Sequence, residues 1–291
     1  MSSFIQRSYF LFIILMMMVG CGSPSKPAGG CVTDSLTAEP FVANRIICSA
    51  PLLTEVVFAL GQEYRLVGRT DYCKYPEASQ QVASVGSVMD PSIETIIDLK
   101  PDVVLTSTHF KREVSDKLNR LGIRTRRIFH QSSSDGAYQT IRDVAALTDC
   151  VERADSLITR MEARKTAILA SIPKERPMPS VYYVVGFGKN GDFTGGGDTF
   201  IHHLITLAGG RNIAADSQGW NYSLEKLMTQ NPDIIMLRQG WKEAFCSQTP
   251  YNQLKAVKNN RVYEINKDLL EINGPRTVDG LALLVSLFYP E

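Results

Sequence analysis

The clearest hydrophobic pattern in the chain lies between residues 150 and 172. Apolar side chains recur there at spacings of three, four or seven, and charged side chains fill the positions between them. This periodicity predicts an amphipathic helix, and Pro173 follows directly as a stop signal. At a rise of about 1.5 Å per residue the helix would span roughly 35 Å, about the width of a small domain. We expect a rigid connecting helix, although a long surface helix of a single domain would show the same pattern.

Short apolar runs alternate with helix-like segments on both sides of this helix. Strands are predicted over residues 45–50, 64–70, 103–107, 124–129, 180–185, 233–237 and 261–265. Helices are predicted over residues 54–60, 92–100, 111–121, 137–147, 199–207, 223–230, 252–257 and 277–288. Such alternation implies parallel sheets covered by helices on both faces. The predicted fold class is therefore α/β, with an N-terminal lobe at residues 44–149, a connecting helix at 150–172 and a C-terminal lobe at 173–291.

An internal repeat supports two related lobes. Residues 92–105 match residues 223–236 without a gap, at a constant offset of 131 residues. Each copy reads as a short helix that begins with Ser-x-Glu, followed by a Pro-Asp turn and a buried strand. The two copies lie on opposite sides of the connecting helix. A cleft between two such lobes is the expected ligand site, because open α/β sheets bind ligands at the carboxyl ends of their strands.

The N-terminus has the features of an export signal. Within residues 1–20 Arg7 is the only charge, and residues 9–19 form an apolar run of signal-peptide length. The run ends at Met18-Val19-Gly20-Cys21, which looks like a lipoprotein signal with small residues before a lipidated Cys21. A plain secretory signal with a nearby cysteine is the alternative. Residues 21–43 are then the lipidated cysteine and a flexible tether.

Composition excludes several classes of function. The formal net charge is +1 and falls to about zero once Arg7 is removed with the signal, so nucleic acid is not an expected partner. Five cysteines besides Cys21 allow one or two disulfides, and the spacing of a structural zinc site is missing. The four histidines are scattered, and the adjacent His202 and His203 would point about 100° apart on a helix, so no metal site is expected. No catalytic triad or carboxylate dyad stands out, and we do not expect an enzyme.

Several short motifs match a known family. They are Arg45-Ile-Ile-Cys-Ser-Ala-Pro51, Thr54-Glu55, Val67-Gly68, Asp71-Tyr72, Tyr75-Pro76, Val85-Gly86 and Leu99-Lys-Pro-Asp102. From residue 44 onward the chain resembles the periplasmic substrate-binding lipoproteins of ABC importers for vitamin B12, haem and iron chelates. The resemblance implies two Rossmann-like lobes on one rigid helix and a monomer on the periplasmic side of a membrane, held there by a lipid anchor.

Within that family the chain looks most like members that bind cobalamin. The similarity rests on Tyr72, Phe187-Gly188, Phe193-Thr194, Trp220 and the pair Asp268 and Arg276. It implies delivery of cobalamin, or a related corrinoid, to an ABC importer, with no cofactor of the protein's own. Val88-Met89 stand where a cobalamin binder often carries a Trp, so haem or a ferric siderophore is the alternative ligand.

The expected ligand-binding residues are mostly aromatic or apolar side chains in loops. They are Tyr72, Val88, Met89, Phe187, Phe193, Trp220, Asn221, Trp241, Asp268 and Arg276. Aromatic walls suit a broad, largely apolar plate, and the polar members suit its amide-bearing rim. Aromatic side chains in loops are also common in packing at the edge of a core.

Glu94 and Glu225 are the acids at equivalent positions of the repeat. Each follows by two residues a serine that can cap its helix, so each lies in the first helical turn, where an acid offsets the helix dipole. The resemblance implies a further role, in which one acid per lobe docks onto arginines of the transporter's two membrane subunits. Two equivalent acids suit such a two-fold partner.

Overall fold

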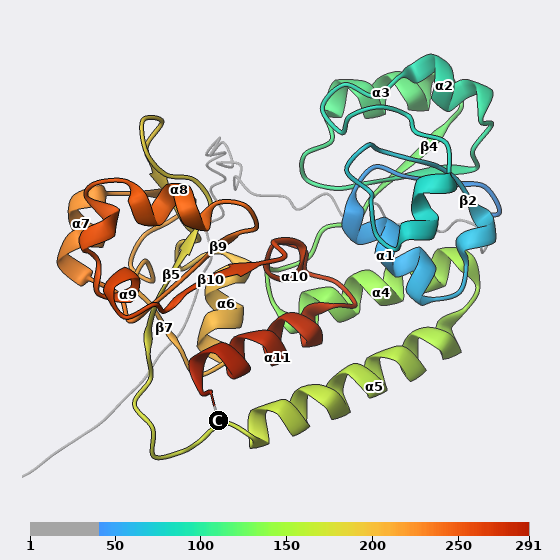
Figure 1. Cartoon of the computed structure of the whole chain (residues 1–291). Coiled ribbons are helices and arrows are strands. Elements are labelled where there is room, and N and C mark those ends of the chain that lie inside the picture. The colour runs from blue at the N-terminus through green and yellow to red at the C-terminus, as the bar shows by residue number, and fades with distance from the viewer. Residues whose placement is uncertain (1–40, 291) are drawn as a thin grey trace, which may run out of the picture. The chain divides into compact units, whose positions relative to one another are not determined.

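The computed structural model describes residues 41–290, and Figure 1 shows its elements. The predicted signal peptide at residues 1–20 and the predicted lipidation site Cys21 lie outside the described residues. Among residues 41–290, none of the helices combines the length and the apolar composition that spanning a membrane requires.

The N-terminal lobe is built on a parallel four-stranded sheet of order β2-β1-β3-β4. The strands are β1 (Ile46–Cys48), β2 (Leu66–Arg69), β3 (Val103–Thr106) and β4 (Arg124–Arg127). The helices are α1 (Pro51–Ala59), α2 (Ile93–Asp98), α3 (Arg112–Arg120) and α4 (Ser134–Thr148), with 3-10 turns η1 (Glu63–Arg65) and η2 (Glu77–Gln81). Successive strand residues point to opposite faces, so Ile46 packs with α1 and α4 while Ile47 packs with α2 and α3.

The C-terminal lobe has a second parallel sheet of order β10-β9-β5-β7. Its strands are β5 (Ser180–Val184), β7 (Arg211–Asn212), β9 (Ile234–Arg238) and β10 (Val262–Ile265), and β6 (Asp192–Phe193) pairs separately with β8 (Asn221–Tyr222). The helices are α6 (Phe200–Leu207), α7 (Leu224–Gln230), α8 (Lys242–Ser247), α9 (Lys255–Lys258), α10 (Asp268–Glu271) and α11 (Thr277–Phe288), with a 3-10 turn η3 (Tyr251–Gln253). The two parallel sheets confirm the predicted fold class.

The structure also confirms the internal repeat. In chain order, each sheet places its first strand between its second and third strands, so the two lobes share one topology. Ser92 caps α2 and Ser223 caps α7 through the same hydrogen bond, to the amide three residues on. The aspartates of the two Pro-Asp turns also correspond. Asp102 accepts hydrogen bonds from the Asn44 and Arg45 amides before β1, and Asp233 accepts one from the Ser180 amide that begins β5.

The predicted connecting helix is α5 (Val151–Ala170), which runs beside α4 and α11 in Figure 1. Its N-terminal half buries Ala154, Ile158 and Met161 in the core of the N-terminal lobe. Farther along, Ile168 and Leu169 pack against the core of the C-terminal lobe. One apolar stripe thus contributes to both cores, which is why the two lobes share this helix.

Two boundaries differ from expectation. Phe41 and Ala43, expected in the tether, belong to the fold, because both pack in the N-terminal core and the Ala43 amide donates to the Leu147 carbonyl at 2.8 Å. Helix α1 begins at Pro51, three residues before the predicted start, since proline is well suited to the first helical position. The four cysteines of the described part, Cys48, Cys73, Cys150 and Cys246, are free thiols.

Candidate functional site

A cleft of about 410 Å³ lies between the two lobes. The N-terminal lobe lines it with residues 50–52, 107–109 and 128–130, which follow β1, β3 and the end of β4. The C-terminal lobe contributes residues 198–201, 219–220 and 270–273. The first two N-terminal segments follow neighbouring strands at the point where the strand order reverses, the usual ligand position in such sheets.

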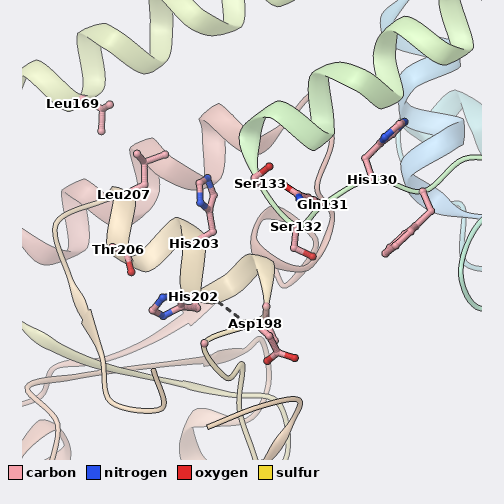
Figure 2. A pocket seen from close by; sticks show the side chains of 13 residues that line it. His130, Gln131, Ser132, Ser133, Leu169, Asp198, His202, His203, Thr206 and Leu207 are labelled. Atoms are coloured by element: carbon pink, nitrogen blue, oxygen red, sulfur yellow. Dashed lines mark hydrogen bonds between the residues drawn. The ribbon is translucent and has the colours of Figure 1, made fainter. Parts of the chain in front are cut away.

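A larger, open cavity of about 1180 Å³ adjoins the cleft (Figure 2). The two share Phe129, His130, Ser132, Asp198 and Thr199 in their linings. In Figure 2 the rings of His202 and His203 point in different directions, as expected for adjacent residues of one helix. Within residues 41–290, no three His, Cys, Asp or Glu side chains are grouped closely enough to hold a metal ion.

Two side chains of the C-terminal lobe hold the loop that leads into α4. The Asn273 amide nitrogen donates to the Gln131 and Ser133 carbonyls at 3.2 and 3.0 Å. The His203 Nε2 atom accepts from the Ser134 amide at 3.3 Å and lies 3.2 Å from its hydroxyl oxygen. His203 therefore satisfies an amide at the start of α4 that has no partner within its own helix, and it does so from the opposite lobe.

This contact predicts a loss of stability in acid. Burial, aided by the charge of Lys165, lowers the pKa of His203, and its accepting nitrogen must stay unprotonated. The folded-state pKa of His203 lies below the unfolded value of about 6.5. The stability that the His203 contact contributes is therefore complete above pH 6.5 and is lost as the pH falls through the folded-state pKa. In urea unfolding, the free energy of unfolding should fall less between pH 7.5 and 5 in His203→Gln than in wild type, because glutamine keeps an acceptor but cannot titrate. His109→Gln, at an exposed histidine of the N-terminal lobe, is the matched control and should behave like wild type; equal pH dependence in all three proteins would contradict the assignment.

A buried ion pair forms a second contact between the lobes. Arg276 donates from Nε to Glu55 at 2.9 Å and from Nη2 to the other carboxylate oxygen, and its guanidinium lies 3.8 Å from the centre of the Tyr75 ring. The side chains of Arg276 and Glu55 are only 12% and 2% exposed. Burial raises the pKa of Glu55, while the hydrogen bonds and charge of Arg276 lower it. Arg276, expected to bind ligand, is thus already paired.

Of the ten expected ligand-binding residues, only Trp220 lines the cleft in this structure, and this residue is 48% exposed. Trp220 is held there by the ribbon of β6 and β8, in which Phe193 pairs with Asn221. The Thr194 amide donates to the Trp220 carbonyl at 2.8 Å. Phe193 and Asn221 themselves are not among the residues that line the cleft.

Phe187 and Trp241 do not line the cleft, because both are half-buried and pack against the core of the C-terminal lobe. The Phe187 ring packs edge-on against Trp241, Phe245 and Tyr251, at centroid distances of 5.8, 5.1 and 5.7 Å. Both residues follow strands, as expected, but Phe187 packs against Phe245 of α8 and Tyr251 of η3, and Trp241 caps the start of α8.

The remaining expected residues lie outside the cleft lining. Tyr72 and Met89 are exposed on the loops that follow β2, whereas Val88 packs against the N-terminal core. Asp268 forms an ion pair with the neighbouring Lys267 at 2.9 Å.

His109, Phe129 and His130 are lining residues that the sequence analysis did not select. Each ends or follows a predicted strand of the N-terminal lobe. The expectation that ligands bind at the carboxyl ends of strands would therefore have selected them. His130 Nε2 lies 2.8 Å from an Asp143 carboxylate oxygen, which orients the ring.

The charge of the lining is distinctive. Among its 22 described residues none is lysine or arginine, while Asp198 and Glu271 are acids. Nearby Arg238 is neutralised, because it donates to the Glu271 carboxylate at 2.9–3.1 Å. One lining acceptor has no hydrogen-bond partner within the described chain, the buried Oδ1 atom of Asn273.

Glu94 and Glu225 lie away from this cleft. Both are exposed in the first turns of α2 and α7, and neither forms an ion pair with the described residues. Their equivalent placement on the two lobes follows from the repeat.

Comparisons with known proteins agree with this architecture. Residues 46–269 match the family model described as periplasmic binding protein. An uncharacterized ABC transporter substrate-binding lipoprotein, YvrC of Bacillus subtilis, is 27% identical over 97% of this chain and 96% of its own. A cobalamin-binding protein of Halobacterium salinarum is 26% identical over 92% of this chain and 75% of its own. The periplasmic heme-binding protein RhuT of Roseiflexus, 24% identical, shares the fold with a TM-score of 0.78 over 85% of this chain and 98% of its own.

Proposed function

Because the chain belongs to the periplasmic binding protein family and is a substrate-binding protein of the ABC-transporter class for vitamin B12, haem and iron chelates, we propose that its ligand is cobalamin or a related corrinoid. Relatives named as cobalamin-binding and vitamin B12-binding proteins support this choice.

The charge of the cleft is the observation that carries the proposal. Haem presents two carboxylates and ferric siderophores are commonly anionic, so their sites need cationic partners, since burying an unpaired charge is costly. The described lining offers neither lysine nor arginine, and the neighbouring Arg238 and Arg276 are already engaged by Glu271 and Glu55. A corrinoid, whose rim carries mainly uncharged amides, makes no such demand.

The free acceptor of Asn273 points to the same ligand class. A buried carbonyl oxygen without a partner costs about 1–3 kcal/mol until a donor reaches it. Once a shift of the 270–273 segment opens this atom to the cleft, the primary amides of a corrinoid can donate to it, whereas the ionised carboxylates of haem can only accept.

Haem is the second candidate, because His109 and His130 both line the cleft. An imidazole could ligate haem iron, and Asp143 would orient His130 for that role.

Titration with cyanocobalamin and with haemin, followed by absorbance and tryptophan fluorescence, separates the two ligands. We expect saturable binding of cyanocobalamin and weaker binding of haemin. Trp220→Ala should weaken cobalamin binding by about 1–3 kcal/mol, the scale for a buried aromatic contact. Tyr64→Ala, which removes an exposed aromatic that does not line the cleft, should leave the affinity for cobalamin unchanged. Tighter binding of haemin, with a change in its absorbance that His109→Ala or His130→Ala removes, would reverse the assignment.

Delivery to the transporter completes the proposal. We propose that Cys21 carries a lipid that holds the protein on the periplasmic side of a membrane. Glu94 and Glu225, both exposed and outside the cleft, would dock on the two membrane subunits. A monomer is sufficient for this arrangement, because one chain presents both acids.

A further inference from the structure

The end of α3 and the edge strand β4 form a strongly basic surface, here called the basic edge. Its cationic side chains are Lys117, Arg120, Arg124, Arg126 and Arg127, and all five residues are exposed. The Asn119 side chain accepts from the Thr125 amide at 3.0 Å and holds the end of the helix beside the strand. Since β4 has no strand on its outer side, the basic edge is open to solvent along the described lobe.

The charges of the basic edge are not balanced locally. None of the five cations forms an ion pair with a carboxylate of residues 41–290. The only acids on α3 itself are Glu113 and Asp116. Arg238 and Arg276, by contrast, are each paired with a carboxylate. A patch of one sign and little counter-charge attracts a partner of the opposite sign.

Protection of the sheet edge accounts for only part of this pattern. Charged side chains on an edge strand prevent pairing with another chain, and one or two on β4 would be enough. Lys117 and Arg120 lie on a helix, where no strand can pair, so they extend the patch beyond the edge itself.

The chain enters the fold at this surface. Phe41, the first described residue, lies under Arg124, whose guanidinium carbon is 3.9 Å from the ring centre. Phe41 lies twenty positions after Cys21, and a segment of that length cannot span more than about 70 Å. A lipid on Cys21 would therefore keep the basic edge within reach of the bilayer surface.

We propose that the basic edge binds the anionic headgroups of the membrane that holds the lipid anchor. The inference rests on the proposed lipidation of Cys21 and not on the identity of the ligand. Helix α2, which carries Glu94, packs on the same face of the sheet as α3. Contact of the basic edge with lipid would thus restrict the orientations in which Glu94 meets a transporter embedded in the same bilayer.

Vesicle sedimentation tests the proposal, using the chain from residue 21 onward with Cys21→Ser so that no lipid is attached. This protein should bind phosphatidylglycerol vesicles and not phosphatidylcholine vesicles, and binding should weaken as salt is raised. Replacing Arg120, Arg126 and Arg127 by glutamine should lower the affinity about fivefold per charge, on the order of a hundredfold in all. Arg124 is kept in place because it covers Phe41.

A matched triple variant controls for net charge. Arg142→Gln, Arg160→Gln and Lys258→Gln remove three exposed cations from α4, α5 and α9 and should leave vesicle binding near wild type. Equal loss in both triples, or no binding to phosphatidylglycerol, would overturn the proposal. The proposal would also be overturned if the protein bound phosphatidylcholine vesicles only when these contain the transporter, since the partner would then be a protein.

The proposed function is checked separately from this inference. Cobalamin titration of the basic-edge triple should match wild type, and mass spectrometry of the full chain extracted from cells reports the lipid on Cys21. If cobalamin does not bind, the proposed ligand is wrong, but the proposal that the basic edge binds anionic lipid is unaffected.

Discussion

Replacing Arg276 by methionine should reduce the free energy of unfolding by about 3–5 kcal/mol. The substitution leaves Glu55, whose side chain is 2% exposed, without the guanidinium that now satisfies both of its oxygens. It also removes the cation that packs on the Tyr75 ring. Urea unfolding at pH 7, followed by circular dichroism, measures the change. Because the loss of Arg276 lets burial raise the pKa of Glu55 further, the deficit should shrink as pH falls and the carboxyl takes up a proton.

An exposed ion pair serves as the control for this result. Arg164 of α5 pairs with Asp279 of α11, but these side chains are 52% and 41% exposed. Arg164→Met should therefore cost no more than about 1 kcal/mol. The double variant Glu55→Leu with Arg276→Met should lose less than Arg276→Met alone, since no buried charge is left unpaired. If Arg276→Met is no more costly than Arg164→Met, the buried pair does not stabilise the junction of the lobes.

Reversing both docking charges, Glu94→Lys with Glu225→Lys, should abolish transport while ligand affinity stays near wild type. Both glutamates are exposed and lie outside the cleft lining, so ligand contacts should persist. Like charges set against cationic transporter subunits can cost several kcal/mol. Uptake of labelled cobalamin into vesicles that contain the transporter measures the first effect, and titration of the purified protein measures the second. Each single variant should transport at an intermediate rate.

A second pair of glutamates provides a matched control for the docking test. Glu152 and Glu243 are also exposed acids in first helical turns, of α5 and α8. Glu152→Lys with Glu243→Lys changes the net charge and the helix-dipole terms by the same amount. It should leave transport near wild type. Normal transport in the Glu94 and Glu225 double variant would show that these residues do not dock the transporter and only offset the dipoles of their helices.

The local elements of this protein could be predicted from the sequence where a periodic pattern is long. The helix at residues 277–288 matches α11 at both ends, and α5 lies within the predicted residues 150–172. The repeat predicted equivalent caps and turns in both lobes, and the structure has them at Ser92 and Ser223. Short elements in irregular segments, such as the β6 and β8 pair, were not predicted because two residues carry no period.

The membership of the cleft could not be predicted in the same way. Phe187, Trp220 and Trp241 give the same local signal, an aromatic side chain in a loop beside a strand or helix. Only packing separates them, because Phe187 and Trp241 pack against the C-terminal core while the β6 and β8 ribbon leaves Trp220 at the cleft. In the N-terminal lobe the position in the sequence is enough, since His109 and Phe129 come shortly after strands and both line the cleft.

The sequence by itself determined the alternating strands and helices of the two α/β lobes and the helix that joins them. These features depend on side-chain spacings of two to seven residues, which act within one segment and can be read from it. The tertiary structure alone decided that Arg276 pairs with Glu55, 221 residues away, that His203 holds the start of α4, and that the cleft lining lacks a cation. Each of these depends on which distant surfaces exclude water together, and no local pattern encodes that choice.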